Sequence, residues 1–181
     1  MDDIVKAALK KWPNVPHCYD WLALDARGDW YLRDEGAQQA GPFPQSRGSR
    51  INHDKLKEFI QRNYDVDERG AWFFQNGPQR VYVTLEAAPW VLGLSQQGRE
   101  FHIDTHTGRE VSSVVNCWLD EQGRVFLATD LGLGVVRSMD MLVASEAIEA
   151  MGWHPQEVAF DELPLRYGYV LKPAAAPEAS A

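Results

Sequence analysis

A chain of 181 residues is long enough for one good-sized hydrophobic core or for two small subdomains that share an interface. Its 45% hydrophobic and 11% aromatic content predicts a folded protein, because disordered chains lack that much apolar surface. The net charge of −8, with 18 basic residues scattered among 26 acidic ones, disfavours nucleic acid and anionic membrane as partners, since both attract clustered Lys and Arg.

The start of the chain and its cysteines predict a cytoplasmic protein. Residues 1–13 are too polar for the apolar core of a signal peptide. No run of about 18 apolar residues that could span a bilayer follows them. Cys18 and Cys117 are the only cysteines, and we expect both to be free thiols in a reducing compartment.

The first quarter of the chain predicts a helix, a hairpin and a long loop. Residues 3–12 carry apolar side chains at helical spacing, and Pro13 ends that pattern. Residues 21–34 contain two apolar runs around Gly28, which is typical of a β-hairpin. Residues 35–50 are rich in Gly and Pro and predict a loop, long enough to be functional or mobile.

The remaining residues predict two more helices and a series of strands. Residues 51–64 form an amphipathic pattern with Asn52 as the expected N-cap. Short strands and Gly-containing turns alternate from 71 to 129, which predicts an antiparallel meander. A helix over 139–151 is expected next, followed by a last pair of strands within 156–173.

Residues 24–32 and 119–127 share the frame Leu-Asp-x-x-Gly-x-apolar-aromatic-Leu, and a helix and a strand follow each copy. The pattern predicts an α+β fold with a predominantly antiparallel sheet, in which two hairpin-helix-strand repeats are joined by a central β-meander. The expected parts of this single compact chain are an N-terminal helix and linker at 1–20, a first hairpin-helix unit at 21–87, the meander with the second hairpin-helix unit at 88–171, and a disordered tail at 172–181.

Several short motifs between residues 21 and 150 have counterparts in one known family. They are Asp29-Trp30-Tyr31, then Ile51, Leu56 and Phe59, then Arg80 to Trp90, Thr105 to Val111 and Gly132-Leu133. Together they resemble an uncharacterised proteobacterial family of unknown function with a repeated hairpin-helix motif. The resemblance implies an α+β fold of repeated motifs, no established reaction, and a suggested role in signalling or ligand sensing. The chain departs from the family in its longer 35–50 loop and in His106, where the family tends to have Asn.

His102, Asp104 and His106 are the candidate metal ligands, and we call them the histidine face. In a strand all three point the same way, because side chains alternate with a period of two residues. Two imidazoles and a carboxylate suit zinc, but a metal site also needs a donor from another element. The alternative, which we favour, is that this face is the solvent side of a hairpin whose other residues face the core.

Two further candidate sites have simple structural explanations. Asp25 and Asp120 occupy equivalent places in the two copies of the repeated frame and are conceivable as an acid–base pair. We instead expect each of them to open a turn by accepting a hydrogen bond from the backbone two residues on. His17 and Cys18 are adjacent, so in an extended segment they point in opposite directions and cannot share a proton.

No nucleotide-binding or hydrolase motif is present in the sequence, so we assign no catalytic residue and no cofactor. Arg47 and Arg50, together with an exposed aromatic ring near the 35–50 loop, suit binding of an anion or a small ligand, but we favour a solvated loop without a ligand. The favoured function is a ligand- or partner-binding module without catalysis. The alternatives are a metal-dependent enzyme built on the histidine face and a scaffolding protein that self-associates through edge strands.

Overall fold

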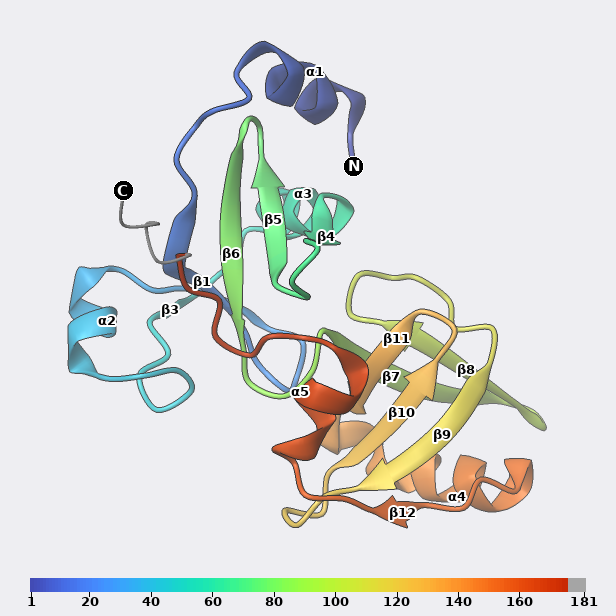
Figure 1. Ribbon diagram of the computed structural model, residues 1–181. Helices are drawn as coiled ribbons and strands as arrows, with labels where there is room; N and C mark the ends of the chain where they lie inside the picture. The colour runs from blue at the N-terminus through green and yellow to red at the C-terminus, as the bar shows by residue number, and fades with distance from the viewer. Residues whose placement is uncertain (176–181) are drawn as a thin grey trace. The chain divides into compact units, whose positions relative to one another are not determined.

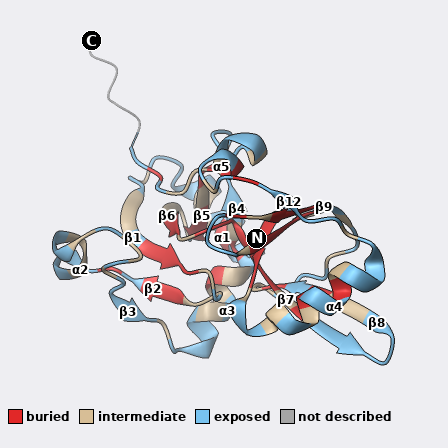
Figure 2. Cartoon of the chain, turned by 90° about the horizontal axis from the view of Figure 1, so that it is seen from below, coloured by how far each residue is buried: buried red, intermediate tan, exposed pale blue. Residues whose placement is uncertain are grey.

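The computed structural model describes residues 1–175, and the chain forms two compact units that each contain one six-stranded sheet (Figure 1). Buried residues concentrate in the strands of both sheets (Figure 2). Part of the expected disordered tail, residues 176–181, lies outside the described residues. Unit 1 consists of Met1–Leu24, Trp30–Leu85 and the described residues from Val170 on, and unit 2 consists of Asp25–Asp29 and Glu86–Tyr169.

The sheet of unit 1 has the strand order β3-β2-β1-β6-β5-β4. Neighbouring strands are antiparallel except for β1 and β6, which run parallel. The strands are β1 (Cys18–Leu24), β2 (Trp30–Leu32), β3 (Ser49–Arg50), β4 (Tyr64–Val66), β5 (Trp72–Asn76) and β6 (Gln79–Leu85).

Three helices belong to unit 1: α1 (Asp3–Lys11), α2 (Glu35–Ala40) and α3 (Asp54–Arg62). The amphipathic helix α3 buries Ile60 and packs the ring of Phe59 edge-on against Phe74 of β5, with 5.4 Å between the ring centroids. The N-cap of α3 is His53, whose Nδ1 accepts a hydrogen bond from the Leu56 amide at 3.2 Å. The prediction that Asn52 caps this helix was therefore wrong by one residue.

The expected loop at 35–50 is more ordered than its composition predicts. It begins with α2, where the Asp34 carboxylate accepts the Ala37 amide at 2.9 Å as an N-cap. The guanidinium of Arg33 is buried, and it donates to the backbone carbonyls of Ala37, Gly41 and Ser46 at 3.3, 2.7 and 3.1 Å. The hydrogen bonds of Arg33 thus anchor a segment that has no apolar periodicity. Hydrophobic periodicity therefore did not reveal the helix.

The sheet of unit 2 has the strand order β12-β9-β10-β11-β7-β8. Two of its strand pairs are parallel, β7 with β11 and β9 with β12, and the others are antiparallel. The strands are β7 (Trp90–Gln97), β8 (Glu100–Thr105), β9 (Val114–Leu119), β10 (Val125–Thr129), β11 (Gly132–Val136) and β12 (Gln156–Glu157).

The helical part of unit 2 corrects the expected end of the fold. A 3-10 turn at Ser138–Asp140 leads into α4 (Met141–Met151), which ends at the left-handed Gly152 as predicted. Of the last expected pair of strands, the first is only the two-residue β12. The start of the second is instead part of the short helix α5 (Glu162–Tyr167), which ends at the left-handed Gly168.

The α+β class and the mostly antiparallel sheets are confirmed, whereas the predicted repeat is not. The two sheets do share an arrangement. Each contains a hairpin followed along the chain by a three-stranded meander, and the last strand of the meander pairs in parallel with the first strand of the hairpin. This arrangement gives β2-β1-β6-β5-β4 in unit 1 and β8-β7-β11-β10-β9 in unit 2. When the two sheets are matched in this way, the β4–β5 turn at Asp67 corresponds to the β9–β10 turn at Asp120. The repeated sequence frame had instead matched Asp120 with Asp25, which lies in the β1–β2 turn.

Four turns share one local hydrogen-bonding pattern, in which a side-chain oxygen accepts the amide four residues on and a Gly occupies the position before that amide. In the three Asp turns the same carboxylate oxygen also accepts the amide two residues on, as predicted for Asp25 and Asp120. The Gly is needed because its φ lies between 75° and 89° in all four. The oxygens belong to Asp25, Asp67, Thr105 and Asp120, and they accept from Asp29, Ala71, Arg109 and Arg124 at 2.9, 3.0, 3.1 and 2.7 Å.

In residues 1–175 no helix is both long and apolar enough to cross a bilayer.

Asp120→Ala should lower the free energy of unfolding by about 2–4 kcal/mol, because it removes acceptors for two backbone amides and for a charged partner. The Asp120 carboxylate is fully buried and accepts from the Gln122 amide and from Nε of Arg124 at 3.0 and 2.7 Å. Urea unfolding followed by circular dichroism measures the change. The matched control is the exposed Asp161→Ala, and equal effects of the two substitutions would contradict the role of the turn.

Candidate functional site

His102 and Asp104 lie on β8, which is an edge strand of the unit 2 sheet, whereas His106 lies in the turn that follows it. Ile103 is buried while Asp104 is exposed, so the strand alternates between a core side and a solvent side as predicted. His102 pairs in register with Ser95, and Asp104 pairs with Gly93, so β7 offers no further metal ligand beside them.

The members of the histidine face line two different hollows. His102 lines an apolar hollow of about 320 Å³ with Phe101 and Trp153. Asp104 and His106 line a polar hollow of about 380 Å³. Among residues 1–175, no group of three or more His, Cys, Asp or Glu side chains is placed to hold a metal ion.

His106 is built into the fold, so the expectation that it faces solvent with the rest of the histidine face was wrong. Its Nδ1 accepts a hydrogen bond from the Val91 amide at 3.2 Å, and its ring lies 5.9 Å from that of Trp90. Burial lowers the pKa of His106 to about 3, so the imidazole stays neutral at physiological pH. Thus His106 supports the hairpin turn.

Neither cysteine forms a disulfide, and Cys117 lacks the features of a nucleophile. Cys18 and Cys117 are both free thiols. Burial raises the pKa of the Cys117 thiol to about 11, which keeps it protonated and unreactive.

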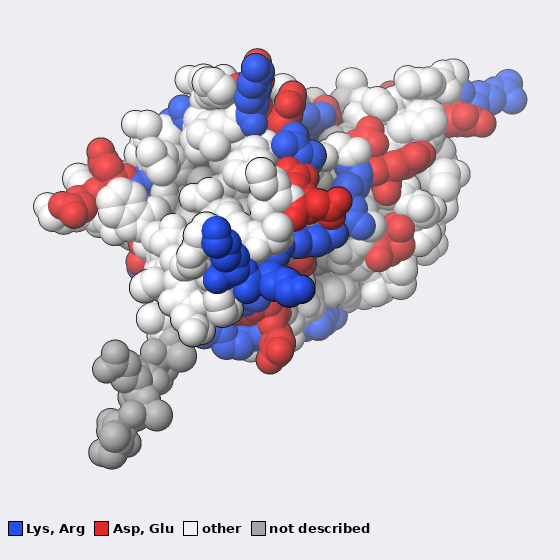
Figure 3. Space-filling view, turned by 90° about the horizontal axis from the view of Figure 1, so that it is seen from above, with Lys and Arg blue, Asp and Glu red and all other residues white. Residues whose placement is uncertain are grey.

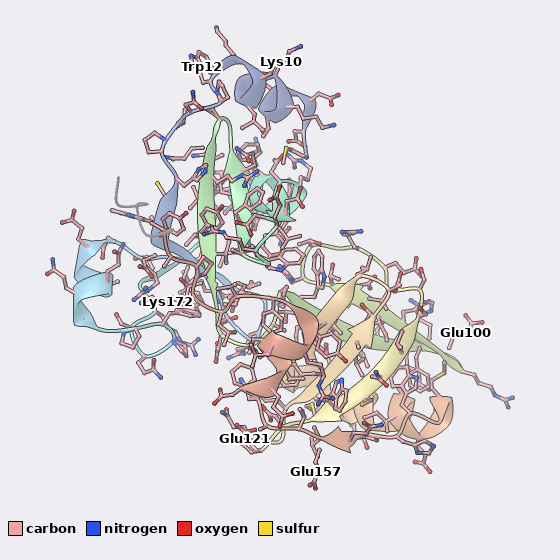
Figure 4. All side chains as sticks on the ribbon, in the orientation of Figure 1. Lys10, Trp12, Glu100, Glu121, Glu157 and Lys172 are labelled. Carbon is pink, nitrogen blue, oxygen red and sulfur yellow. The ribbon has the colours of Figure 1, made fainter. Side chains whose placement is uncertain are left out.

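An acidic hollow of about 520 Å³ in unit 2 is lined by Asp120, Glu121, Glu157 and Glu162, and Figure 4 labels two of these side chains. Three of its carboxylates already have partners within the fold, including Glu162, which binds Arg166 at 3.2 Å. Asp120 binds Arg124, and Oε2 of Glu121 accepts the Phe160 amide at 2.8 Å. These contacts explain the cluster as part of the packing of the β9–β10 turn.

The strongest candidate site is a hollow of about 550 Å³ in unit 1, which we call the aromatic–arginine pocket. Three parts of the sheet form it: the start of β1, the β4–β5 turn and the first half of β6. It lies on the sheet face that bears Phe73 and Tyr82, where Tyr19 and Val170 pack beside them. The lining residues are His17, Tyr19, Val66, Asp67, Glu68, Arg69, Arg80 and Tyr82.

A β-bulge directs Tyr19 into this pocket. The register between β1 and β6 shifts between Cys18 and Leu22. Within the bulge, Asp20 has a φ of 65°, and no other non-Gly residue of the described chain has a positive φ. The ring of Tyr19 stacks on that of Tyr82 at 4.7 Å with an interplanar angle of 3°. Bulges and left-handed non-Gly residues are enriched at functional sites, so this local strain marks the pocket.

Asp67 joins the turn to the pocket. One carboxylate oxygen accepts the Arg69 and Ala71 amides, and the other accepts the Tyr82 hydroxyl at 3.0 Å and binds the Arg69 guanidinium at 3.1 Å. Burial alone raises the pKa of Asp67, but the hydrogen bonds outweigh it and leave the pKa below its usual value. In turn, hydrogen bonds to Tyr19, Asp67 and Tyr82 raise the pKa of Arg69.

Three basic groups face the pocket, and only one of them has a carboxylate partner. The guanidinium of Arg80 lies 4.4 Å from the ring centre of Phe73, and no ion pair joins it to a carboxylate of the described residues. Burial, followed by the nearby charges of Arg80 and Arg69, lowers the pKa of His17. Crowded positive charges favour the binding of an anion, because an anion relieves their mutual repulsion.

The sequence contained a signal for this pocket that composition alone did not reveal. Asp67-Glu68-Arg69-Gly70 is a third copy of the Asp-x-x-Gly turn, and Arg80-x-Tyr82 places two chemically useful side chains on one face of a strand. What sequence could not supply is the pairing of β1 with β6, which brings Tyr19 to Tyr82. Arg47 and Arg50, the candidate anion ligands of the 35–50 loop, lie outside the pocket, and Arg47 packs over the ring of Tyr31.

Comparison with known proteins identifies the family, since a family described as "Protein of unknown function (DUF2946)" matches residues 1–174. The chain belongs to this family, DUF2944. The predicted resemblance to an uncharacterised family of unknown function is therefore confirmed. No curated protein matches the DUF2944 chain.

Two solved structures are similar to this DUF2944 chain, and both are DUF1285 family proteins from proteobacteria. The protein from Silicibacter pomeroyi DSS-3 is 13% identical, with a TM-score of 0.49, and the match covers 81% of this chain and 84% of that one. The protein from Shewanella baltica OS155 is 15% identical, with a TM-score of 0.46, and the match covers 70% of this chain and 91% of that one.

The buried His106 should make the protein less stable in mild acid. Its folded pKa of about 3 lies below the ordinary value of 6.5, so the unfolded chain binds the proton more readily and stability falls as the pH drops below 6.5. Over that window this one residue contributes a slope of up to about 1.4 kcal/mol per pH unit.

His106→Asn tests this slope, because the Asn side chain can still accept the Val91 amide but does not titrate. Urea unfolding from about pH 7 to about pH 5 should show a shallower pH dependence for the variant than for the wild type. Parallel curves for the two proteins would show that His106 is not buried as a neutral group.

Proposed function

We propose that this chain is a non-catalytic ligand-binding module whose aromatic–arginine pocket binds a small organic anion. The observation that carries the proposal is Arg80, a cation without a carboxylate partner among the described residues, held over an aromatic ring at the edge of a hollow. Arg69 lines the same hollow while paired with Asp67, and His17 adds positive charge there once it is protonated. Tyr19 and Tyr82 add an aromatic surface against which the apolar part of a ligand can pack.

The polar groups of the pocket suit binding better than proton transfer. The Asp67 carboxylate already accepts two backbone amides, a tyrosine hydroxyl and a guanidinium, so it is stabilised as an anion and is a poor general base. Tyr82 is a poor acid, because burial raises its pKa. Groups in these states position a ligand without reacting with it.

A cytoplasmic location and a role in signalling remain parts of this proposal. The two free thiols support a reducing compartment. The sensing role follows from the resemblance noted in the sequence, and a pocket that binds an anion without converting it is consistent with a sensor. A protein partner would then recognise the ligand-bound form.

Arg80→Gln should weaken binding of phenyl phosphate by about tenfold or more, because it removes a charge-assisted hydrogen bond. Amide NMR shifts during a phenyl phosphate titration give the dissociation constant and locate the ligand. The matched control is Arg99→Gln, an exposed arginine in the β7–β8 turn of unit 2. The proposal fails if phenyl phosphate leaves the amides of unit 1 unshifted, or if Arg80→Gln binds it as tightly as the wild type.

Binding should also strengthen as the pH falls, because an anion in the pocket favours protonated His17. The free protein has a lowered His17 pKa and the complex a higher one, so affinity rises as the pH falls through the pKa of the complex and levels off below that of the free protein. Benzenesulfonate is the appropriate probe, since its own charge is constant across this range. A His17→Gln variant should bind it with nearly constant affinity, and identical pH profiles for the two proteins would exclude His17 from the site.

A further inference from the structure

We propose that the ligand of the aromatic–arginine pocket is a phosphate monoester carried on a flat ring system, a ligand of the mononucleotide class. This inference rests on the proposed function and narrows it to one chemical class. It follows from three features of the pocket: the number of donors, the accessible ring of Tyr19, and the balance of charges around the hollow.

The basic groups match a phosphate better than a carboxylate. A phosphate monoester presents three acceptor oxygens and a charge of about −1.5 to −2 near neutral pH. Arg80 presents a planar fork of donors, and His17 adds another donor when protonated. A carboxylate has only two oxygens and one charge, so it would leave part of this donor set unused.

The stacked tyrosines provide a place for a flat ring. Tyr82 is only 2% exposed and lies beneath Tyr19, which remains partly accessible and lines the hollow. A base or a similar ring can extend this parallel stack, because aromatic side chains bind flat rings through their faces. Val66, 40% exposed, supplies apolar surface on another side of the same hollow.

Size and charge limit the ligand further. The hollow of about 550 Å³ falls within the usual range of small-ligand pockets, roughly 300–1,000 Å³, and leaves room for a ring system larger than a phenyl group. Asp67 and Glu68 also line it, so a triphosphate, which carries more negative charge, would be repelled more strongly than a monophosphate.

A free ligand fits better than the end of a nucleic acid. Lys and Arg side chains are interspersed with Asp and Glu on the surface in Figure 3, whereas a polynucleotide needs a continuous basic track.

The test compares AMP, adenosine, inorganic phosphate, benzoate and phenyl phosphate by isothermal titration calorimetry on the full chain. AMP should bind about tenfold or more tightly than adenosine, inorganic phosphate or benzoate, because only AMP combines a large ring with a phosphate monoester. Tyr19→Leu should remove the advantage of AMP over inorganic phosphate while phosphate binding persists. Trp12→Leu, at an exposed aromatic residue directly after α1, is the matched control and should change neither value.

The outcomes separate this inference from the proposed function. If phenyl phosphate binds in unit 1 but AMP binds no better than inorganic phosphate or benzoate, the ligand class is wrong and the anion site stands. If neither phenyl phosphate nor AMP binds, both claims fail. Tighter binding of ten-residue oligothymidylate than of AMP would overturn the assignment to a free mononucleotide.

Discussion

The carboxylate of Asp67 is the group on which the pocket depends. Its two oxygens hold the β4–β5 turn through backbone amides and simultaneously fix Tyr82 and Arg69. Without that carboxylate, the amides of a tight turn, a buried hydroxyl and a guanidinium would all lose an acceptor, each loss costing about 1–3 kcal/mol. The same interaction therefore closes a hairpin and sets the geometry of the proposed binding surface.

In the corresponding turn of unit 2, an arginine of the turn itself packs beside the Asp carboxylate. There Asp120 binds Arg124, whose guanidinium carbon lies 4.3 Å from the ring centre of Phe160 and 5.4 Å from that of Phe126. In unit 1, Arg80 lies over the ring of Phe73 and lines the aromatic–arginine pocket. The Asp-x-x-Gly turn thus borders a hollow in both units, and we propose that the hollow of unit 1 is the one that binds a ligand.

Sequence predicted the parts of the fold that depend on local chemistry. The helices α1, α3 and α4 follow from apolar periodicity, and the turns at Asp25 and Asp120 follow from the hydrogen bonds that an Asp side chain makes with its own backbone. The alternation along β8 likewise indicated the solvent side of a hairpin. Each of these signals lies within about a dozen residues of sequence.

The remaining features depend on contacts between distant residues. The buried Arg33 organises the 35–50 loop through three carbonyls, a pattern that no composition reveals. Tyr19 and Tyr82 meet only because β1 pairs in parallel with β6, and the bulge at Asp20 adjusts their stacking. The predicted repeat is not confirmed for a related reason, since a shared local frame does not say which strand each hairpin pairs with.

The most direct test of the binding site is to detect contacts between a bound ligand and the pocket by NMR. In a protein with labelled tyrosine rings, the ring protons of bound AMP should give nuclear Overhauser effects to Tyr19, and Tyr19→Leu should abolish them. A ligand that binds but shows such effects only to tyrosines of unit 2, such as Tyr167, would contradict the assignment of the site.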